Sequence, residues 1–299
     1  MPIRSLKPLT PSIGLTLALL LCLAFTLPAP VQAGDAKGYV APPDGTTGIL
    51  IYGRHRTGNE RYKEGKRDSQ DANYNLNLQI LRPVYYKEIK GIMTTVQALI
   101  PFGSVSVSGP AYGNTTLSTS GLMDPTVLFG IWPINDPDNK FWVAFSQWFQ
   151  APFGDYDAYR PLNLGKNRWA FKTEASLTKG FGNFYLDLVP SIEFYTDNDN
   201  YGAASATEKM DPLFRLETHF SYDFTPTFML SLGHYYEKGG ETEVAGVKQK
   251  NEKDNHALQL TLGFRPAPKQ QLLVQYWRDV DIESGFLTHQ YGLRYFFIF

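Results

Sequence analysis

LFRLETHFSYDF, residues 213–224, alternates apolar and polar side chains along its whole length. One set is Phe214, Leu216, Thr218, Phe220, Tyr222 and Phe224; the other is Arg215, Glu217, His219, Ser221 and Asp223. Successive side chains of a β-strand point to opposite faces of the sheet, whereas a helix would repeat near 3.6 residues. The stretch therefore predicts a strand with one apolar face and one polar face.

The same alternation recurs in NYNLNLQIL (73–81), RWAFKTEASL (168–177) and HALQLTLGF (256–264). In each of them we expect the apolar set to form a wall that faces lipid. For the first stretch that set is Tyr74, Leu76, Leu78 and Ile80. FWVAFSQWFQ (141–150) is bulky on both faces, so its inside and outside are not assigned from the sequence.

The whole chain yields twelve such strands, separated by links that alternate between short and long. The expected strands are 47–57, 72–85, 91–102, 122–133, 140–152, 166–179, 182–195, 212–224, 227–237, 255–265, 270–279 and 286–299. The strands of a soluble β-sandwich also alternate in polarity, but its short and long loops do not follow one another in strict alternation. Short turns on one side and long loops on the other are typical of an outer-membrane barrel, as is an even number of strands. We therefore predict an all-β, transmembrane, up-and-down antiparallel β-barrel.

Composition supports this architecture and excludes some partners. The chain has 299 residues, of which 14% are aromatic, and aromatic side chains gather near the expected strand ends, as in interfacial girdles. The formal net charge is −1, so no basic excess exists to bind nucleic acid. No cofactor and no metal is expected, because the histidines are scattered without a metal-ligand spacing.

The N-terminal residues predict export. Arg4 and Lys7 precede the apolar run 13–27, and Val31 and Ala33 occupy small-residue cleavage positions. We expect 1–33 to be a cleaved signal peptide; the run is short for a membrane anchor. The single cysteine, Cys22, would leave with it, and Leu21 before it argues against a lipid anchor. The mature chain would then comprise 34–46 and the barrel 47–299. We interpret 34–46 as a short periplasmic lead-in, and the alternative is a segment that enters the lumen as a gate.

The chain ends on LRYFFIF (293–299), an apolar ladder at alternate positions. Tyr295, Phe297 and Phe299 resemble the terminal pattern by which bacterial outer-membrane proteins reach their insertion machinery. The expected location is the outer membrane of a Gram-negative bacterium, with lipid and lipopolysaccharide as surroundings.

The stretch APFGDYDAYRPLNLGKNRW (151–169) carries a family resemblance. It is similar to outer-membrane proteins labelled "putative meta-pathway of phenol degradation", with weaker support from 42–48, 100–103 and 121–130. The matching residues are Pro152, Gly154, Tyr156, Asp157, Asn163, Gly165, Asn167, Arg168 and Trp169. The resemblance implies a barrel that takes up hydrophobic or aromatic small molecules.

The face opposite the lipid is expected to line a lumen with charges of both signs. Candidate lumen-lining residues are Arg54, Arg82, Lys172, Glu174, Asp187, Glu193, Arg215, Glu217, His219, Asp223, Arg265 and Arg294. They fit either a charged, weakly selective pore or a salt-bridged plug, since barrels of about eight strands are filled and those of about sixteen are open.

Two other functions remain open. A structural or adhesive barrel would act through its charged outer loops. An outer-membrane lipid hydrolase would need a nucleophile, and His219 and Ser221, beside Glu217, form the only His-x-Ser pattern of the sequence. We expect them to face the lumen, where an acyl chain in the bilayer could not reach them. No catalytic residue is therefore predicted, and passive passage of a small-molecule solute is the favoured function.

Overall fold

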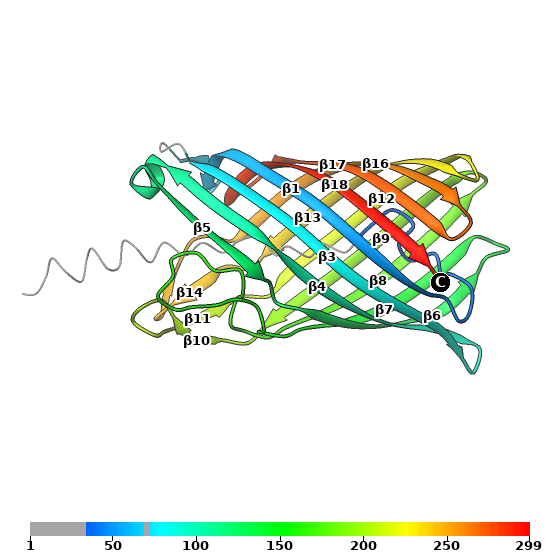
Figure 1. Cartoon of the computed structure of the whole chain (residues 1–299), viewed down its shortest axis with the longest axis horizontal. Coiled ribbons are helices and arrows are strands. Elements are labelled where there is room, and N and C mark those ends of the chain that lie inside the picture. Colours follow the sequence, from blue (N-terminus) through cyan, green and yellow to red (C-terminus); the bar gives the residue numbers. More distant parts are fainter. Residues whose placement is uncertain (1–33, 69–71) are drawn as a thin grey trace, which may run out of the picture.

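Residues 34–68 and 72–299 are described by the structure, a computed structural model, and twelve of its antiparallel strands close into a barrel (Figure 1). They are β1 (Thr47–Lys63), β3 (Asn73–Ile89), β4 (Ile92–Gly109), β6 (Thr126–Asp136), β7 (Phe141–Gln150), β8 (Ala170–Phe181), β9 (Phe184–Tyr195), β12 (Leu213–Thr225), β13 (Phe228–Gly239), β16 (Lys253–Ala267), β17 (Gln270–Asp281) and β18 (Gly285–Ile298). Each strand pairs with its neighbour along the chain, and β18 pairs with β1 to leave no free edge. The predicted fold class and strand number are confirmed. The predicted signal peptide, 1–33, lies outside the described residues.

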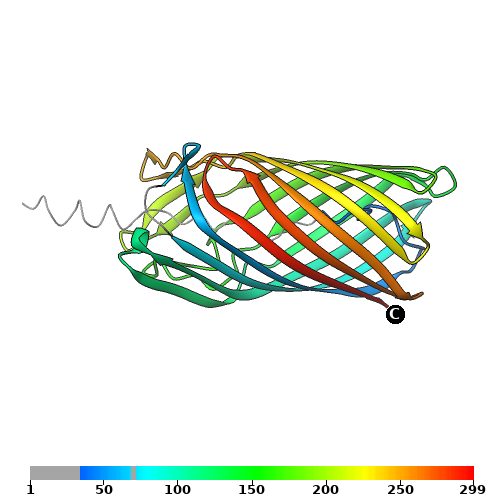
Figure 2. The ribbon, with the colours of Figure 1, turned by 90° about the horizontal axis from the view of Figure 1, so that it is seen from above.

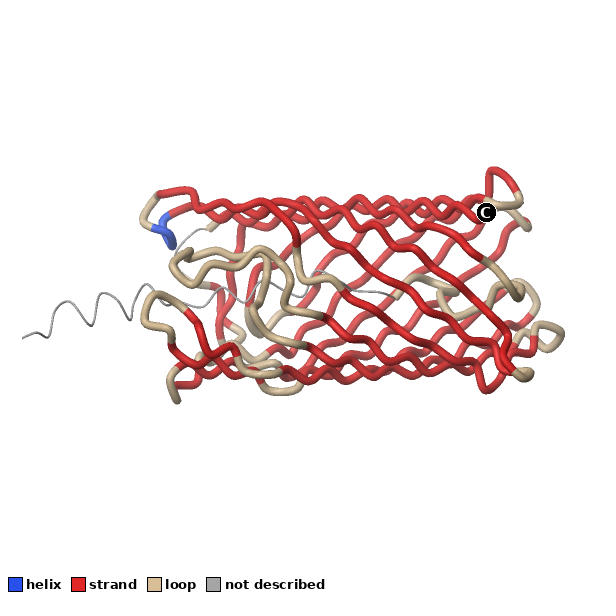
Figure 3. Tube along the Cα trace, turned by 60° about the horizontal axis from the view of Figure 1, so that its bottom comes forward, coloured by secondary structure: helices blue, strands red, loops and turns tan. Residues whose placement is uncertain are grey.

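The two ends of the barrel differ, as the alternation of link lengths predicts. The short turns and the C-terminus lie at one end, on the right of Figures 1 and 3, which the barrel class assigns to the periplasm. Lys90 and Gly91 form one of these turns with φ values of 52° and 80°, which is the two-residue type I′ geometry of hairpins. Among the described residues no helix is long and apolar enough to cross a membrane.

The long loops at the extracellular end contain structure that the sequence did not reveal. Four short strands form a second sheet beside the mouth, as the left of Figure 1 shows. They are β10 (Asn198–Tyr201), β11 (Ala206–Met210), β14 (Thr242–Val244) and β15 (Val247–Lys248). The expectation of a plain loop at 103–121 is wrong, because β4 continues to Gly109 and pairs with β5 (Thr115–Leu122) beyond the short 3-10 helix η1 (Pro110–Tyr112). β2 (Lys66–Arg67) folds back on β1.

An apolar belt covers the outside of the barrel. Phe129, Phe145 and Leu260 are 53%, 48% and 45% exposed, although each is a large apolar side chain in the middle of a strand. Such a surface would be unfavourable in water and is what a lipid-facing wall requires. The predicted faces of 168–177, 213–224 and 256–264 agree with this belt, because their polar sets are buried and their apolar sets point outward.

The orientation expected for 73–81 is wrong. Tyr74, Leu76, Leu78 and Ile80 are buried inside the barrel, and the intervening Asn and Gln side chains point outward. The register gives the reason, because outward positions of β1, β3, β4 and β5 at this height form polar rows: His55, Asn77, Ser104 and Ser120 make one row, and Thr57, Asn75, Ser106 and Ser118 make the next. This part of the wall stands beyond the lipid belt, so its outside is polar and its inside can be apolar.

The strand 141–150, left unassigned by the sequence, is resolved by its burial pattern. Its inward side chains are Trp142, Ala144, Ser146, Trp148 and Gln150. Phe145 and Phe149 lie on the outward side, 48% and 37% exposed. Two tryptophans therefore occupy the lumen, not the interface with lipid.

An arginine placed on the lipid belt should destabilise the barrel strongly. For Phe145→Arg we expect a loss of about 2–4 kcal/mol in the free energy of unfolding, because the charge enters the bilayer near its middle. For Ser118→Arg, on an outward position above the belt, we expect about 0–1 kcal/mol. Denaturant unfolding in lipid vesicles measures both, and equal losses would contradict the assignment of the belt.

Candidate functional site: the lumen and the segment inside it

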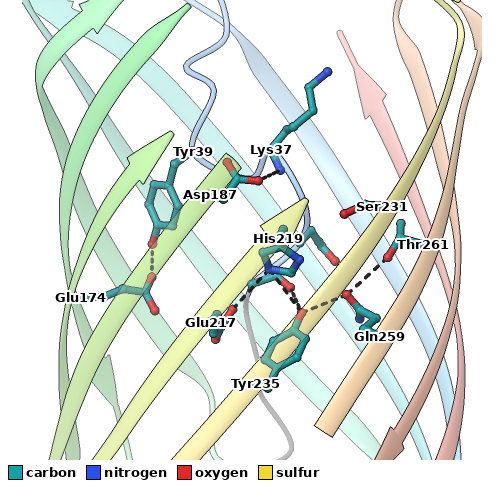
Figure 4. A network of polar contacts seen from close by, with 12 residues as sticks. Lys37, Tyr39, Glu174, Asp187, Glu217, His219, Ser231, Tyr235, Gln259 and Thr261 are labelled. Carbon is teal, nitrogen blue, oxygen red and sulfur yellow. Dashed lines mark hydrogen bonds and ion pairs between the residues drawn. The ribbon is translucent and has the colours of Figure 1, made fainter. Parts of the chain in front are cut away.

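Residues 34–41 lie inside the barrel, between its middle and its periplasmic end, and residues 42–46 lead to the periplasmic rim, where Asp44 pairs with Lys87. The dark blue segment is visible within the right half of the molecule in Figure 2, and its side chains meet the barrel wall in Figure 4. The segment contains tight turns closed by hydrogen bonds from Gly38 N to Asp35 O and from Thr46 N to Pro43 O, and its last residue bonds Tyr86 N at the rim. The contacts that hold this segment against the barrel wall are described below.

Asp35 joins the segment to the last two strands. Its Oδ2 accepts a hydrogen bond from Arg294 Nη1 of β18 at 2.8 Å, and its Oδ1 accepts one from Gln275 Nε2 of β17 at 2.8 Å. The side chains of Asp35 and Arg294 are only 4% and 8% exposed. A buried charge pair is strongly unfavourable to break from one side, because the remaining charge stays desolvated.

Lys37 joins the segment to β9 and β12, which lie three to five strands away from β17 and β18 around the barrel. Its Nζ pairs with Asp223 Oδ2 of β12 at 2.7 Å and lies 3.9 Å from the centre of the Tyr185 ring. Its backbone N–H donates to Asp187 Oδ2 of β9 at 2.9 Å, while Thr178 donates to the other carboxylate oxygen at 2.6 Å. Ion pairs thus hold the segment against two separate parts of the barrel wall.

Tyr39 makes the third anchor, against β6, β7 and β8. Its hydroxyl donates to Glu174 and lies 3.0 Å from Ser146 Oγ. Trp132 Nε1 donates to the backbone carbonyl of Tyr39 at 2.8 Å, and the two rings lie 6.3 Å apart. Figure 4 shows Tyr39 and Lys37 reaching different strands from one short stretch of backbone.

The segment's first described residue, Gly34, lies against a buried polar cluster at mid-barrel. Tyr235 donates from its hydroxyl to the Gly34 carbonyl at 2.8 Å, and the same hydroxyl is 2.9 Å from Gln259 Oε1. Glu217 and His219, next to it on β12, are 2% and 1% exposed. A methyl group on Gly34 would coincide with Glu217 Oε2, so only glycine fits at this contact.

The structure places the predicted lumen residues as follows. Buried inside the barrel are Arg54, Lys172, Glu174, Asp187, Glu193, Arg215, Glu217, His219 and Arg294. Arg82 and Asp223 are partly buried, Arg82 donating to Gln97 and Tyr52 and Asp223 pairing with Lys37. Arg265 is exposed at the periplasmic end of β16, so it is not enclosed as the others are.

A second network of charges lies at the extracellular end of the lumen. Arg215 of β12 pairs with Glu193 of β9 and, at 2.7 Å, with Glu237 of β13, which also pairs with Lys253 at 3.2 Å. Lys166, in the loop after β7, lies close enough to Glu193 to interact with its charge. Burial lowers the pKa of Lys166 to about 8, despite the opposing effects of Glu193 and Asp124.

The motif loop 151–169 folds into this end and is fixed by Asp124. The Asp124 carboxylate accepts hydrogen bonds from Gly154 N at 2.9 Å and from Lys166 N at 2.8 Å. A Cβ on Gly154 would lie 2.8 Å from Gly165 Cα, so two motif glycines allow two stretches of the loop backbone to come into contact. Pro152 is the second residue of this loop, which follows β7.

Polar motif residues tie the loop to the small outer sheet. Asn163 Oδ1 accepts from Asp157 N at 2.9 Å, and Asn167 Nδ2 donates to Asn198 Oδ1 at 2.7 Å. Tyr156 donates to Asn200 O at 2.8 Å, and Arg168 forms a buried ion pair with Glu208 of β11. Trp169 is 41% exposed and packs edge-on against Phe153 on the outside. The motif residues thus hold the loop 151–169 against the small outer sheet at the extracellular end of the barrel.

One wall of the lumen is apolar. A continuous cluster of buried side chains covers the inner faces of β1, β3, β4, β6 and β7 and is completed by Leu162 and Leu164 from the motif loop. Its other members are Leu50, Tyr52, Tyr74, Leu76, Leu78, Ile80, Val84, Leu99, Val105, Val107, Met123, Leu128 and Trp148. The charged side chains described above come mostly from β8, β9, β12, β13, β16 and β18, while Arg54 and Arg82 lie on β1 and β3. The interior therefore has an apolar side and a charged side.

Residues 57–295 match the family model described as "Putative MetA-pathway of phenol degradation". The chain belongs to this family. A solved outer membrane channel from Pseudomonas putida F1 is 30% identical, with a TM-score of 0.84, over 89% of this chain and 100% of that chain. The β domain of a Bordetella autotransporter matches at 10% identity and a TM-score of 0.54, over 86% and 100% of the two chains, and shows the fold alone. No curated protein sequence matches the chain significantly.

The family assignment and the closed barrel place the protein in the bacterial outer membrane. In this family member, sequence reasoning missed Asp35, Lys37 and Tyr39, because a short segment rich in Gly and Pro has no periodicity to read. It also missed Tyr235 and Gln259, although both fall on the inward, alternate positions of their strands. No group of three or more potential ligands among His, Cys, Asp and Glu gathers within the described ranges.

Proposed function

We propose that this outer-membrane barrel is a channel for passive passage of small molecules, aromatic and other hydrophobic ones among them, and that residues 34–46 keep it closed at the periplasmic half. The observation that carries the proposal is the apolar inner wall from β1 to β7, facing a charged wall. A purely structural barrel could fill its interior with either kind of side chain. A route for a hydrophobic solute needs an apolar surface that binds weakly and releases.

The family description and the Pseudomonas putida channel support this proposal. The charged wall has a part in it as well, because it holds 34–46 in place through Asp35, Lys37 and Tyr39. Binding along the apolar wall would be spread over several side chains, and the solute would move down its gradient without an energy source.

The lipid-hydrolase alternative has little geometric support. Ser221 donates to Ser231 Oγ at 3.1 Å, and no hydrogen bond joins it to the imidazole of His219 within the described chain. Both side chains are 2% exposed or less and lie inside the barrel. We therefore propose no catalytic residue. Recognition of Tyr295, Phe297 and Phe299 by insertion machinery, and contact of the outer loops with lipopolysaccharide, stay proposals.

Single-channel recording of the mature chain in planar bilayers tests the proposed function. We expect small conductance steps that aromatic solutes interrupt, because the solute and the ions share one lumen. Interruptions by aromatic solutes but not by sugars of similar size would support the apolar route. A folded barrel whose current no aromatic solute affects would argue for an outer-loop function.

The charge of Lys166 should make ion selectivity depend on pH. A lysine ordinarily titrates near 10.5, and burial lowers this pKa to about 8, so its positive charge is lost as pH rises from 7 to 9. We expect the reversal potential in a salt gradient to shift toward cation preference over that range. Lys166→Met should abolish the shift, whereas Lys250→Met, at an exposed loop position, should retain it. A shift that survives Lys166→Met would exclude Lys166 as its source.

A further inference from the structure

Glu217 is a buried acid whose carboxylate has few favourable partners among the described residues. Its side chain is 2% exposed, and its Oε2 accepts no hydrogen bond in the described part of the chain. The ion pair available to it there is with His219 Nε2, at 4.0 Å, and the second ring nitrogen of that histidine also lacks a hydrogen bond. A buried carboxylate without a hydrogen-bonding partner is expensive, so a missing donor is expected at this position.

The backbone of the segment in the lumen lies directly against this oxygen. A Cβ built on Gly34 would coincide with Glu217 Oε2, which places the backbone around the Gly34 Cα in contact with the carboxylate. Tyr235 holds the same residue from the other side through its hydrogen bond to the Gly34 carbonyl. The position of Gly34 is thus fixed, and its nitrogen is one covalent bond from the atom that meets Glu217.

The sequence predicts that this nitrogen becomes a terminus, since the expected cleavage follows Ala33. Hydrolysis of that peptide bond consumes one water and leaves a carboxylate on Ala33 and an α-amine on Gly34. Near neutral pH much of that amine is protonated, because such groups have a pKa of about 7.7–8.0. An amide N–H has one hydrogen and no charge, whereas the ammonium has three donors and a positive charge.

We propose that Glu217 is the binding site for the α-ammonium group of Gly34 that signal-peptide removal creates. The ion pair fixes the free end of the segment at mid-barrel, while Asp35, Lys37 and Tyr39 fix the rest. Gly34 is required because any side chain would displace the carboxylate. Removal of the signal peptide thus completes the binding of the segment in the lumen. In a chain that is extended or blocked at its N-terminus, the segment is bound less tightly. The inference concerns seating and does not depend on whether the barrel conducts.

A single introduced cysteine tests the pair without any transport assay. Ala36, 5% exposed and packed with Met229 and Leu273, is replaced by cysteine in the mature chain 34–299, which has no other cysteine. The rate at which a charged maleimide modifies the refolded protein reports how often the segment leaves its place. The chain is prepared with the α-amine free or acetylated, each with and without Glu217→Gln, and heat-modifiability on gels verifies folding.

We expect acetylation to raise the modification rate by about tenfold or more when Glu217 is present, because it leaves a buried charge unpaired. In Glu217→Gln the effect of acetylation should fall to within about twofold, which is the signature of direct coupling. Asp223→Asn is the matched control: it weakens the Lys37 anchor, yet the effect of acetylation should persist in it.

Three outcomes would overturn the proposal. The first is an equal effect of acetylation with and without Glu217→Gln, and the second is rapid modification of the introduced cysteine in every form. The third is an intact mass of the exported protein showing that the mature chain does not begin at Gly34. If Glu217→Gln does not fold, Gly34→Ala replaces it, because the added methyl group displaces the carboxylate while keeping residue 217 unchanged.

Discussion

Removing residues 34–44 should raise the conductance of the channel several-fold. These residues extend from the middle of the lumen to its periplasmic rim and bond to β8, β9, β12, β17 and β18. The deletion keeps the signal peptide and joins it to Gly45, so strand β1 and the closing pairing with β18 remain. Single-channel steps in planar bilayers and swelling of proteoliposomes by sugars of increasing size measure the effect.

A substitution of the anchors gives a control that preserves the length of the chain. Asp35→Asn together with Lys37→Met removes one buried and one partly buried ion pair, so we expect the channel to fluctuate between the full-length and the deleted conductance. Asp44→Asn removes only an exposed pair with Lys87 at the rim, which should change little. An unchanged conductance after deletion would mean that 34–44 does not obstruct the path of ions.

The twelve strands could be predicted because two independent patterns agree. Alternation locates each strand, and the alternation of link lengths separates a barrel from a sandwich, since each short turn must lie at the same end. The stretch 213–224 shows why this worked: its lipid face and its lumen face differ in polarity at nearly every position. Ten or more residues of this kind leave little freedom in register or in facing.

The facing of 73–81 could not be predicted, because alternation shows that two faces differ and not which of them is inside. The apolar side chains of Leu76 and Leu78 point into the lumen, and the polar side chains of Asn75 and Asn77 face water outside the membrane. The height of a strand relative to the bilayer decides this, and it depends on how far β4 and β5 extend.

The residues of the barrel wall that face the lumen could be predicted from the sequence. The segment inside the lumen and its contacts could not. Charged residues at inward positions, such as Arg215 and Glu174, follow directly from alternation. Their partners do not, because Arg294 pairs with Asp35 across almost the whole chain. The residues that we propose keep the lumen closed lie in a segment without secondary structure, and only its contacts with the wall reveal its place.

A polar substitution in the apolar wall should weaken the interaction with aromatic solutes. Leu78 is 1% exposed and lies within the apolar cluster on β3, opposite the charged strands. For Leu78→Asn in the chain lacking 34–44, the loss of about one apolar side-chain contact, near 1 kcal/mol, should shorten the blocks caused by an aromatic solute about fivefold. The residence time of each block in the current trace measures this directly.

The control for this substitution lies on the other wall and has a similar burial. Thr261→Val on β16 changes a buried side chain of the charged side, 1% exposed, without touching the apolar cluster, so it should leave the blocking time unaltered. Ionic conductance should stay close to that of the parent in both variants, because ions follow the charged wall. If Leu78→Asn lowers the conductance and leaves the blocking time unchanged, aromatic solutes do not use the apolar wall, and the hydrophobic route fails while a general diffusion channel survives.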